Sequence, residues 1–88
     1  MREDRRSAED VSRWIRDFLS QRDRDIEPDL DQDLFAEGVL DSLGVVSLVT
    51  GLESRFGARL TEKDFQDPRF STIRGLSAIV SEARERPG

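Results

Sequence analysis

Residues 41–57 read DSLGVVSLVTGLESRFG. The apolar residues of this stretch recur at i, i+3, i+4, i+7 and i+11, the spacing of one helical face: Val45, Leu48, Val49, Leu52 and Phe56. Asp41 and Ser42 are residue types that cap the starts of helices, and Gly57 stands where a glycine commonly ends one. The stretch therefore predicts an amphipathic helix with Ser42 in its first turn.

A first helix is predicted upstream, because apolar residues again follow one helical face: Val11, Trp14, Ile15, Phe18 and Leu19. Ser7 can cap this helix, since Glu9 and Asp10 would then lie in its first turn, where negative charge is favoured. We interpret Trp14 as a residue of the core or its edge.

Two further helices are predicted downstream. Thr61, followed three residues later by Asp64, indicates a short capped helix that Pro68 ends. Either Ser71 or Thr72 can cap a last helix. The inward residues of that helix are Ile73, Leu76, Ile79, Val80 and Ala83.

Residues 23–41 lack helical periodicity and contain Pro28, while Leu34 and Phe35 are suited to hold the segment against a core. We expect an ordered loop that crosses the bundle. The predicted fold is all-α, a four-helix bundle with one short third helix and a long loop between helices one and two. It forms one domain over residues 1–88, with an ordered core at about 7–83.

The composition excludes several classes of function. The net charge is −5, and Lys and Arg are not clustered, so we expect no nucleic acid partner. Cys and His are absent, which removes the thiolate ligand and the commonest general base, so we expect no enzyme. No apolar run is long enough to span a membrane and no secretory signal is present, so a cytoplasmic location is expected.

Asp29, Asp31 and Asp33 imitate the opening of a calcium-binding loop. Leu34, however, occupies the position where such a loop requires glycine, and Leu40 occupies that of the bidentate glutamate. We therefore predict no metal site and interpret the three acids as part of a solvated loop.

Residues 34–44 read LFAEGVLDSLG, and together with the apolar pattern of residues 48–56 they resemble the acyl carrier and peptidyl carrier protein family. In that family a phosphopantetheinyl transferase attaches 4'-phosphopantetheine, taken from coenzyme A, to the serine of an Asp-Ser-Leu motif. The resemblance implies Ser42 as the attachment residue, with Asp41 and Leu43 beside it.

A helix start suits this modification, because unpaired backbone N–H groups and the helix dipole favour a negatively charged phosphodiester there. The simpler interpretation is that Asp41 or Ser42 only caps the helix. Both can hold, with Asp41 as the cap and Ser42 as the bearer of the arm.

Leu43, Val46 and Thr50 are predicted to face away from the core stripe and form a surface for partner proteins. This helix lacks most of the acids that fatty-acid carriers present to their partners, so we expect recognition to depend less on charge. Gly44 and Gly51 lie on one side of the helix, where we expect a neighbouring helix to approach closely; a partner or a stowed acyl chain is the alternative.

The resemblance implies a carrier protein that holds a thioester-linked acyl or aminoacyl group on the arm at Ser42. Its partners would be an acyl- or aminoacyl-adenylating ligase or an acyltransferase, and a downstream condensing or transfer enzyme. Residues 37–42 and 67–70 are most similar to stand-alone aminoacyl carriers, such as D-alanyl carrier proteins, and to secondary-metabolite carriers.

The arginine-rich composition favours polyketide or nonribosomal peptide biosynthesis, and we expect a monomer. The alternative is an unmodified helical module for protein interaction.

Overall fold

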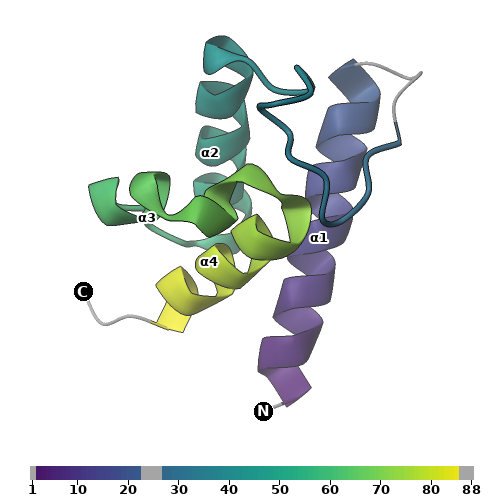
Figure 1. Ribbon diagram of the computed structural model, residues 1–88. Coiled ribbons are helices and arrows are strands. Elements are labelled where there is room, and N and C mark those ends of the chain that lie inside the picture. Colours follow the sequence, from purple (N-terminus) through teal and green to yellow (C-terminus); the bar gives the residue numbers. More distant parts are fainter. Residues whose placement is uncertain (1, 23–26, 86–88) are drawn as a thin grey trace.

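The computed structural model describes residues 2–22 and 27–85. These residues form four α-helices and one 3-10 helix, and no strand occurs among them. The elements are α1 (Arg2–Arg22), α2 (Ser42–Phe56), α3 (Glu62–Gln66), the 3-10 helix η1 (Pro68–Ser71) and α4 (Ile73–Glu85) (Figure 1). The predicted all-α bundle with a short third helix and a long first connection is confirmed.

The longest helix, α1, forms one side of the bundle (Figure 1). Its fully buried residues recur every four positions, at Val11, Ile15 and Leu19. Trp14 and Phe18 lie at the edge of the core with their rings stacked, the centroids 5.5 Å apart. The prediction that Trp14 lies in the core or at its edge is thus confirmed. Neither α1 nor any other described helix is long and apolar enough to cross a membrane.

The prediction that Ser7 caps the first helix is wrong, because α1 begins at Arg2. The residues between Arg2 and Ser7 are arginines and acids, and neither glycine nor proline interrupts them. Arg and Glu are good helix formers and nothing here ends a helix, so it continues toward the N-terminus past the last apolar residue of its stripe. A residue type that favours helix caps is therefore weak evidence for the start of a helix unless a glycine or proline lies beside it.

The helices α2 and α4 supply most of the remaining core. The side chains of Leu48 and Leu52 of α2 are fully buried, and Gly57 ends this helix in the left-handed conformation with φ 67°. All the predicted inward residues of α4 are buried: Ile73, Leu76, Ile79, Val80 and Ala83. Each fully buried Leu or Ile contributes about 1.5–3 kcal/mol to folding. The extensive packing of α1 on α4, and its lighter packing on α2, forms one continuous core.

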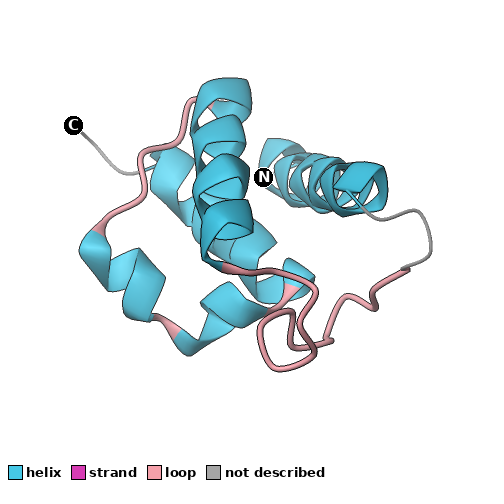
Figure 2. Ribbon diagram, turned by 90° about the horizontal axis from the view of Figure 1, so that it is seen from above, coloured by secondary structure: helices cyan, strands magenta, loops and turns pink. Residues whose placement is uncertain are grey.

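The described part of the long loop, residues 27–41, passes the end of η1 and the start of α4 (Figure 2). The Leu34 N–H donates to the Ser71 carbonyl at 2.8 Å, and the Arg74 N–H donates to the Leu30 carbonyl at 2.9 Å. The Arg74 guanidinium also donates to Asp31 at 2.8 Å, which lowers the pKa of that carboxyl. The predicted ordered crossing loop is confirmed for these residues; residues 23–26 lie outside the description.

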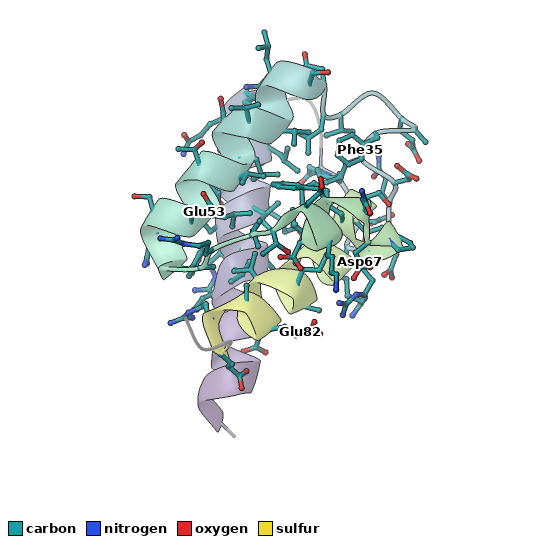
Figure 3. The ribbon with its side chains drawn as sticks, turned by 90° about the vertical axis from the view of Figure 1, so that its left-hand side faces the viewer. Phe35, Glu53, Asp67 and Glu82 are labelled. Atoms are coloured by element: carbon teal, nitrogen blue, oxygen red, sulfur yellow. The ribbon has the colours of Figure 1, made fainter. Side chains whose placement is uncertain are left out.

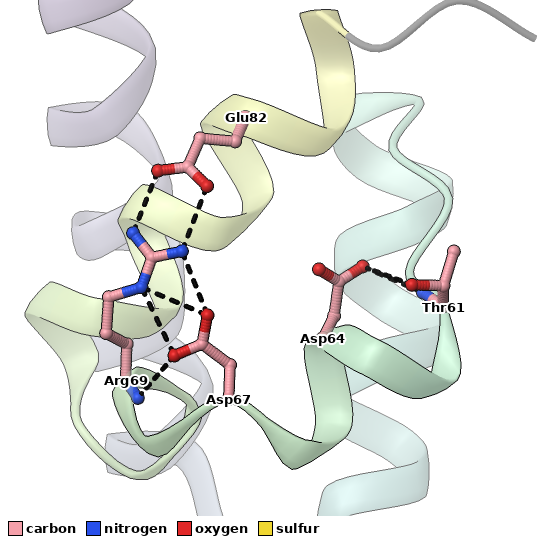
Figure 4. Close-up of polar contacts among 5 residues, drawn as sticks. All are labelled: Thr61, Asp64, Asp67, Arg69 and Glu82. Carbon is pink, nitrogen blue, oxygen red and sulfur yellow. Dashed lines mark hydrogen bonds and ion pairs between the residues drawn. The ribbon is translucent and has the colours of Figure 1, made fainter.

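The segment between α2 and α4 contains the predicted short helix. The Asp64 carboxylate accepts hydrogen bonds from the Thr61 backbone N–H at 2.8 Å and from its hydroxyl at 3.2 Å (Figure 4). The Arg69 guanidinium donates both to Glu82 of α4, at 2.8 Å, and to Asp67, at 3.0 Å. The bonds from Arg69 to Asp67 lower the pKa of that carboxyl, and the bonds to Glu82 hold η1 against α4.

Of the two residues predicted as possible caps of the last helix, Thr72 forms the cap and Ser71 does not. The Thr72 hydroxyl oxygen accepts a hydrogen bond from the Gly75 N–H at 2.9 Å, so Thr72 is the cap of α4. The Ser71 hydroxyl instead donates to the Pro68 carbonyl at 3.1 Å. Pro68 therefore does more than end the third helix, because it also begins η1, an element that the apolar pattern did not predict.

Candidate functional site

Ser42 is the first residue of α2 and lies at the end of the bundle where α1 ends (Figure 1). Its side chain is exposed, and within the described part of the chain its hydroxyl makes no hydrogen bond. The hydroxyl therefore lies where the sequence predicts it, at a helix start. A surface hydroxyl that no internal bond occupies is accessible to a modifying enzyme.

Asp41 caps α2 and leaves Ser42 without that role. Asp41 has extended backbone angles, φ −112° and ψ −177°, and its Oδ1 accepts the Gly44 N–H at 2.7 Å. Its carbonyl accepts the Val45 N–H at 2.9 Å, the first hydrogen bond of the helix. Of the two caps that the sequence left open, Asp41 is thus the one that forms, and the Ser42 hydroxyl takes no part in capping.

Two large apolar side chains near Ser42 are exposed to solvent. Leu43 is 79% exposed and Val46 is 63% exposed, and Thr50, one further turn along α2, is exposed as well. All three lie on the outward side of the helix, as predicted, whereas Leu48 on the inward side is fully buried. The core of this chain does not use these apolar groups.

Arg22, the last residue of α1, approaches the start of α2. Its Nη2 lies 3.9 Å from Asp41 Oδ1 and would lie 3.2 Å from a Cβ built on Gly44. Arg22 was not predicted as part of this site, because the long loop separates it from Asp41 and no pattern along the chain indicates that the two helix ends meet. Its position gives the site a positive charge that sequence reasoning missed.

Comparison with known families matches residues 11–80 to the family described as the phosphopantetheine attachment site. The chain belongs to this family. D-alanyl carrier protein of Streptococcus thermophilus is 40% identical over 60 residues, which cover 68% of this chain and 76% of the relative. D-alanyl carrier protein of Streptococcus sanguinis is 38% identical with the same coverage. That of Lacticaseibacillus casei is 35% identical, over 68% of this chain and 74% of the relative.

No solved structure gives a significant match to the chain. The family match nevertheless establishes a phosphopantetheine-binding carrier protein, which holds its cargo and is not an enzyme. The group that such a carrier holds is 4'-phosphopantetheine. The exposed Ser42 hydroxyl at the start of α2, which no other described residue bonds, fits this group, since the group needs a surface hydroxyl for its phosphodiester bond.

At Gly51 a side chain of the same carrier protein, Trp14 of α1, packs closely against α2. A Cβ added at Gly51 would overlap the ring of Trp14, lying 2.8 Å from Cζ2. The occupant of this side of α2 is thus the neighbouring helix α1, as expected. At Gly44 the near atoms belong to Leu40, Asp41 and Arg22 of the same chain.

The one acid of α2, Glu53, is also used within the fold (Figure 3). Its Oε2 accepts the Leu60 N–H at 2.9 Å and so holds the connection that follows α2. Glu53 is half-buried and is the one acid within α2, so this helix carries little negative charge. The expectation that recognition through α2 depends less on negative charge than in fatty-acid carriers stays a prediction.

An aromatic cluster on the surface of the carrier protein was not predicted. Phe35 of the loop (Figure 3) stacks on Phe70 of η1 with ring centroids 6.2 Å apart. Phe65 of α3 meets Phe70 edge-on, with ring centroids 5.3 Å apart. Phe35 is 39% exposed and Phe65 is 45% exposed. Sequence reasoning missed the cluster because its rings come from three separate elements.

The acids of the loop have structural partners. Asp33 Oδ1 accepts the backbone N–H groups of Phe35 at 3.0 Å and Ala36 at 2.9 Å, and Asp31 is bonded to Arg74. Among the residues that the structure describes, no group of three acids is arranged to hold a metal ion. Two of the three aspartates that imitate a calcium loop thus serve to shape the loop that leads to Ser42.

Proposed function

We propose that this carrier protein holds 4'-phosphopantetheine on Ser42 and carries an aminoacyl group on the thiol of that arm. The observation that supports this most directly is the exposed, unpaired hydroxyl of Ser42 at the first position of α2, inside the span of the family match. The arm supplies the thiol that a chain without cysteine lacks.

The chain itself prepares Ser42 for the transferase. Asp41 keeps the first turn of α2 formed through its bond to the Gly44 N–H. The start of a helix of fifteen residues favours the negative charge of a phosphodiester. During attachment the Ser42 oxygen forms a bond to phosphorus, the bond between that phosphorus and the nucleotide part of coenzyme A breaks, and the hydroxyl proton passes to a base of the transferase.

D-alanine is the first cargo to test. The relatives described above are named D-alanyl carrier proteins, which supports an aminoacyl cargo loaded by an adenylating ligase. A downstream transfer enzyme then removes the aminoacyl group from the arm. In this proposal the carrier protein acts as a monomer and is located in the cytoplasm. The prediction of polyketide or nonribosomal peptide biosynthesis, with an acyltransferase or a condensing enzyme as partner, has no support from these relatives and stays a prediction.

Partner enzymes contact the outward side of α2 in this proposal. Leu43 and Val46 offer apolar area beside the attachment residue, and Thr50 extends the same side. A small apolar surface suits brief binding, which a carrier needs in order to pass from one enzyme to the next. The exposed acids of the loop, such as Asp29 and Glu37, supply attraction at longer range toward basic partners.

Intact-protein mass spectrometry tests the attachment. The purified chain is incubated with coenzyme A, magnesium and a transferase of broad specificity, and the expected result is a gain of one phosphopantetheine. Ser42→Ala should abolish the gain. Ser47→Ala, which removes an exposed hydroxyl elsewhere on α2, should retain it. No gain in the wild type would instead support the alternative of an unmodified interaction module.

Loading of the modified chain tests the cargo. The holo-protein is incubated with ATP, an adenylating ligase of a D-alanyl system and either D-alanine, L-alanine or glycine. We expect a further mass gain with D-alanine and release of the amino acid by hydroxylamine, which cleaves thioesters. A holo-protein that this ligase does not load, but that accepts acyl groups from an acyltransferase, would favour the polyketide setting.

A further inference from the structure

The end of α1 holds a positively charged group over the first turn of α2. Arg22 Nη2 lies 3.9 Å from Asp41 Oδ1 and would lie 3.2 Å from a Cβ on Gly44. The Cζ of Arg22 lies 5.9 Å from the centre of the Phe18 ring, at a distance typical of cation–π contacts. The guanidinium is therefore placed by contacts with both helices.

The hydrogen-bond donors of Arg22 have no acceptor among residues 2–22 and 27–85. A guanidinium has five N–H donors, yet within the described residues Arg22 makes no hydrogen bond, and its 3.9 Å contact with Asp41 is too long for one. Its side chain is 41% exposed. Arg69 and Arg74 differ, since each donates several bonds of 2.8–3.3 Å to carboxylates of the chain.

The charges around Ser42 indicate what those donors can bind. The Asp41 carboxylate adjoins Ser42 in the chain and is already negative, so a phosphodiester on Ser42 adds a second negative charge beside it. Two like charges at close range repel each other. A guanidinium near Asp41 offsets this repulsion, and its planar donors match the oxygens of a phosphate.

We propose that Arg22 binds the phosphodiester of the prosthetic group on Ser42, so that the end of α1 forms the second half of the cofactor-binding site. This inference rests on the proposed attachment at Ser42. Arg22 is a binding residue here, and its guanidinium lies beside Asp41, which adjoins Ser42 in the chain.

The ³¹P chemical shift of the holo-protein tests the contact. We compare the wild type with Arg22→Gln, with Arg22→Lys, and with Arg13→Gln, which removes the same charge from an exposed position lower on α1. The wild-type and Arg13→Gln signals should move toward that of free phosphopantetheine as sodium chloride is added. The Arg22→Gln signal should already lie near the free value at low salt, and Arg22→Lys should fall between them.

Unfolding in urea gives a second readout. The arm should increase the folding equilibrium constant of the wild type, relative to the unmodified chain, by about two- to fivefold at low salt, the range of an exposed ion pair. Arg22→Gln should lose this increase and Arg13→Gln should keep it. If Arg22→Gln does not fold, Arg22→Met replaces it, since methionine keeps an apolar stem over Phe18.

The outcomes separate this inference from the proposed function. A wild type that gains the arm, with ³¹P shift, salt response and stability increase all equal to those of Arg22→Gln, would overturn the role of Arg22 and leave attachment at Ser42 intact. A wild type that gains no arm would overturn the attachment itself.

Discussion

The two sides of α2 carry similar apolar residues but have opposite surroundings. Leu48 and Leu52 on the inward side have no exposed surface, whereas Leu43 and Val46 on the outward side are 79% and 63% exposed. Burial gives the inward pair a large share of the folding free energy, while the outward pair can gain comparable burial only against another molecule. The inward side of α2 thus stabilises the fold, while the outward side is available for the proposed contact with partners. Substitutions on the inward side should lower the free energy of unfolding, and those on the outward side should weaken partner binding.

Leu48→Ala should have the largest effect on stability. Removal of a fully buried leucine leaves a cavity between α2 and its neighbours, so the free energy of unfolding should fall by about 2–5 kcal/mol. Urea unfolding followed by circular dichroism measures this change. The folded fraction should still accept phosphopantetheine at the wild-type rate, and a loss below about 1 kcal/mol would contradict the assignment of Leu48 to the core.

Gly51→Ala comes next in size. Alanine favours helices over glycine by about 1 kcal/mol, but its Cβ would overlap the Trp14 ring, so we expect a net destabilisation of about 1–3 kcal/mol. Urea unfolding measures the loss, and Trp14 fluorescence should shift as the ring is displaced. Thr50→Ala, at the exposed adjacent position, serves as the control and should change stability by less than about 0.5 kcal/mol. A stabilised Gly51→Ala variant would show that α1 does not pack here as described.

Asp41→Ala should cost about 1 kcal/mol, because the cap bond to the Gly44 N–H is lost. Asp41→Asn keeps an oxygen acceptor and should retain most of the stability. Thermal or urea unfolding of the unmodified chain measures both. If the two variants were equally destabilised, the negative charge rather than the cap bond would be the stabilising feature.

The double variant Leu43→Ser and Val46→Ser should have the smallest effect on stability, within about 0.5 kcal/mol of the wild type. The KM for the holo-protein as substrate of its loading ligase should nevertheless rise about fivefold or more, as expected when apolar contacts are removed from the centre of an interface. Steady-state loading kinetics measure this increase. An unchanged KM would show that the outward side of α2 is not the partner surface.

Local patterns were sufficient to predict α2. Its apolar stripe, its Asp41 cap and the glycine that ends it all lie within one short stretch, and all agree with the structure. The same holds for the Thr61 and Asp64 cap of α3. Where no breaker marked a boundary, as before Ser7, the start of α1 was placed too late.

Contacts between distant segments could not be predicted in this way. Arg22 reaches Asp41 because α1 and α2 run in opposite directions beside each other, which no periodicity along the chain reveals. The cluster of Phe35, Phe65 and Phe70 likewise depends on where the loop, α3 and η1 meet. Ser42 and its cap were identified, while the surroundings that three-dimensional packing provides were not.

The bonds that hold the long loop to the start of α4 have a consequence for biosynthesis. The loop that delivers Ser42 is fixed by the Ser71 carbonyl and the Arg74 N–H, which the ribosome adds long after the serine. A nascent chain that ends at α2 contains Ser42 but lacks the two groups that hold the preceding loop. A chain truncated after α2 should therefore hold residues 27–41 less firmly than the full chain, because the Ser71 carbonyl and the Arg74 N–H are missing from it.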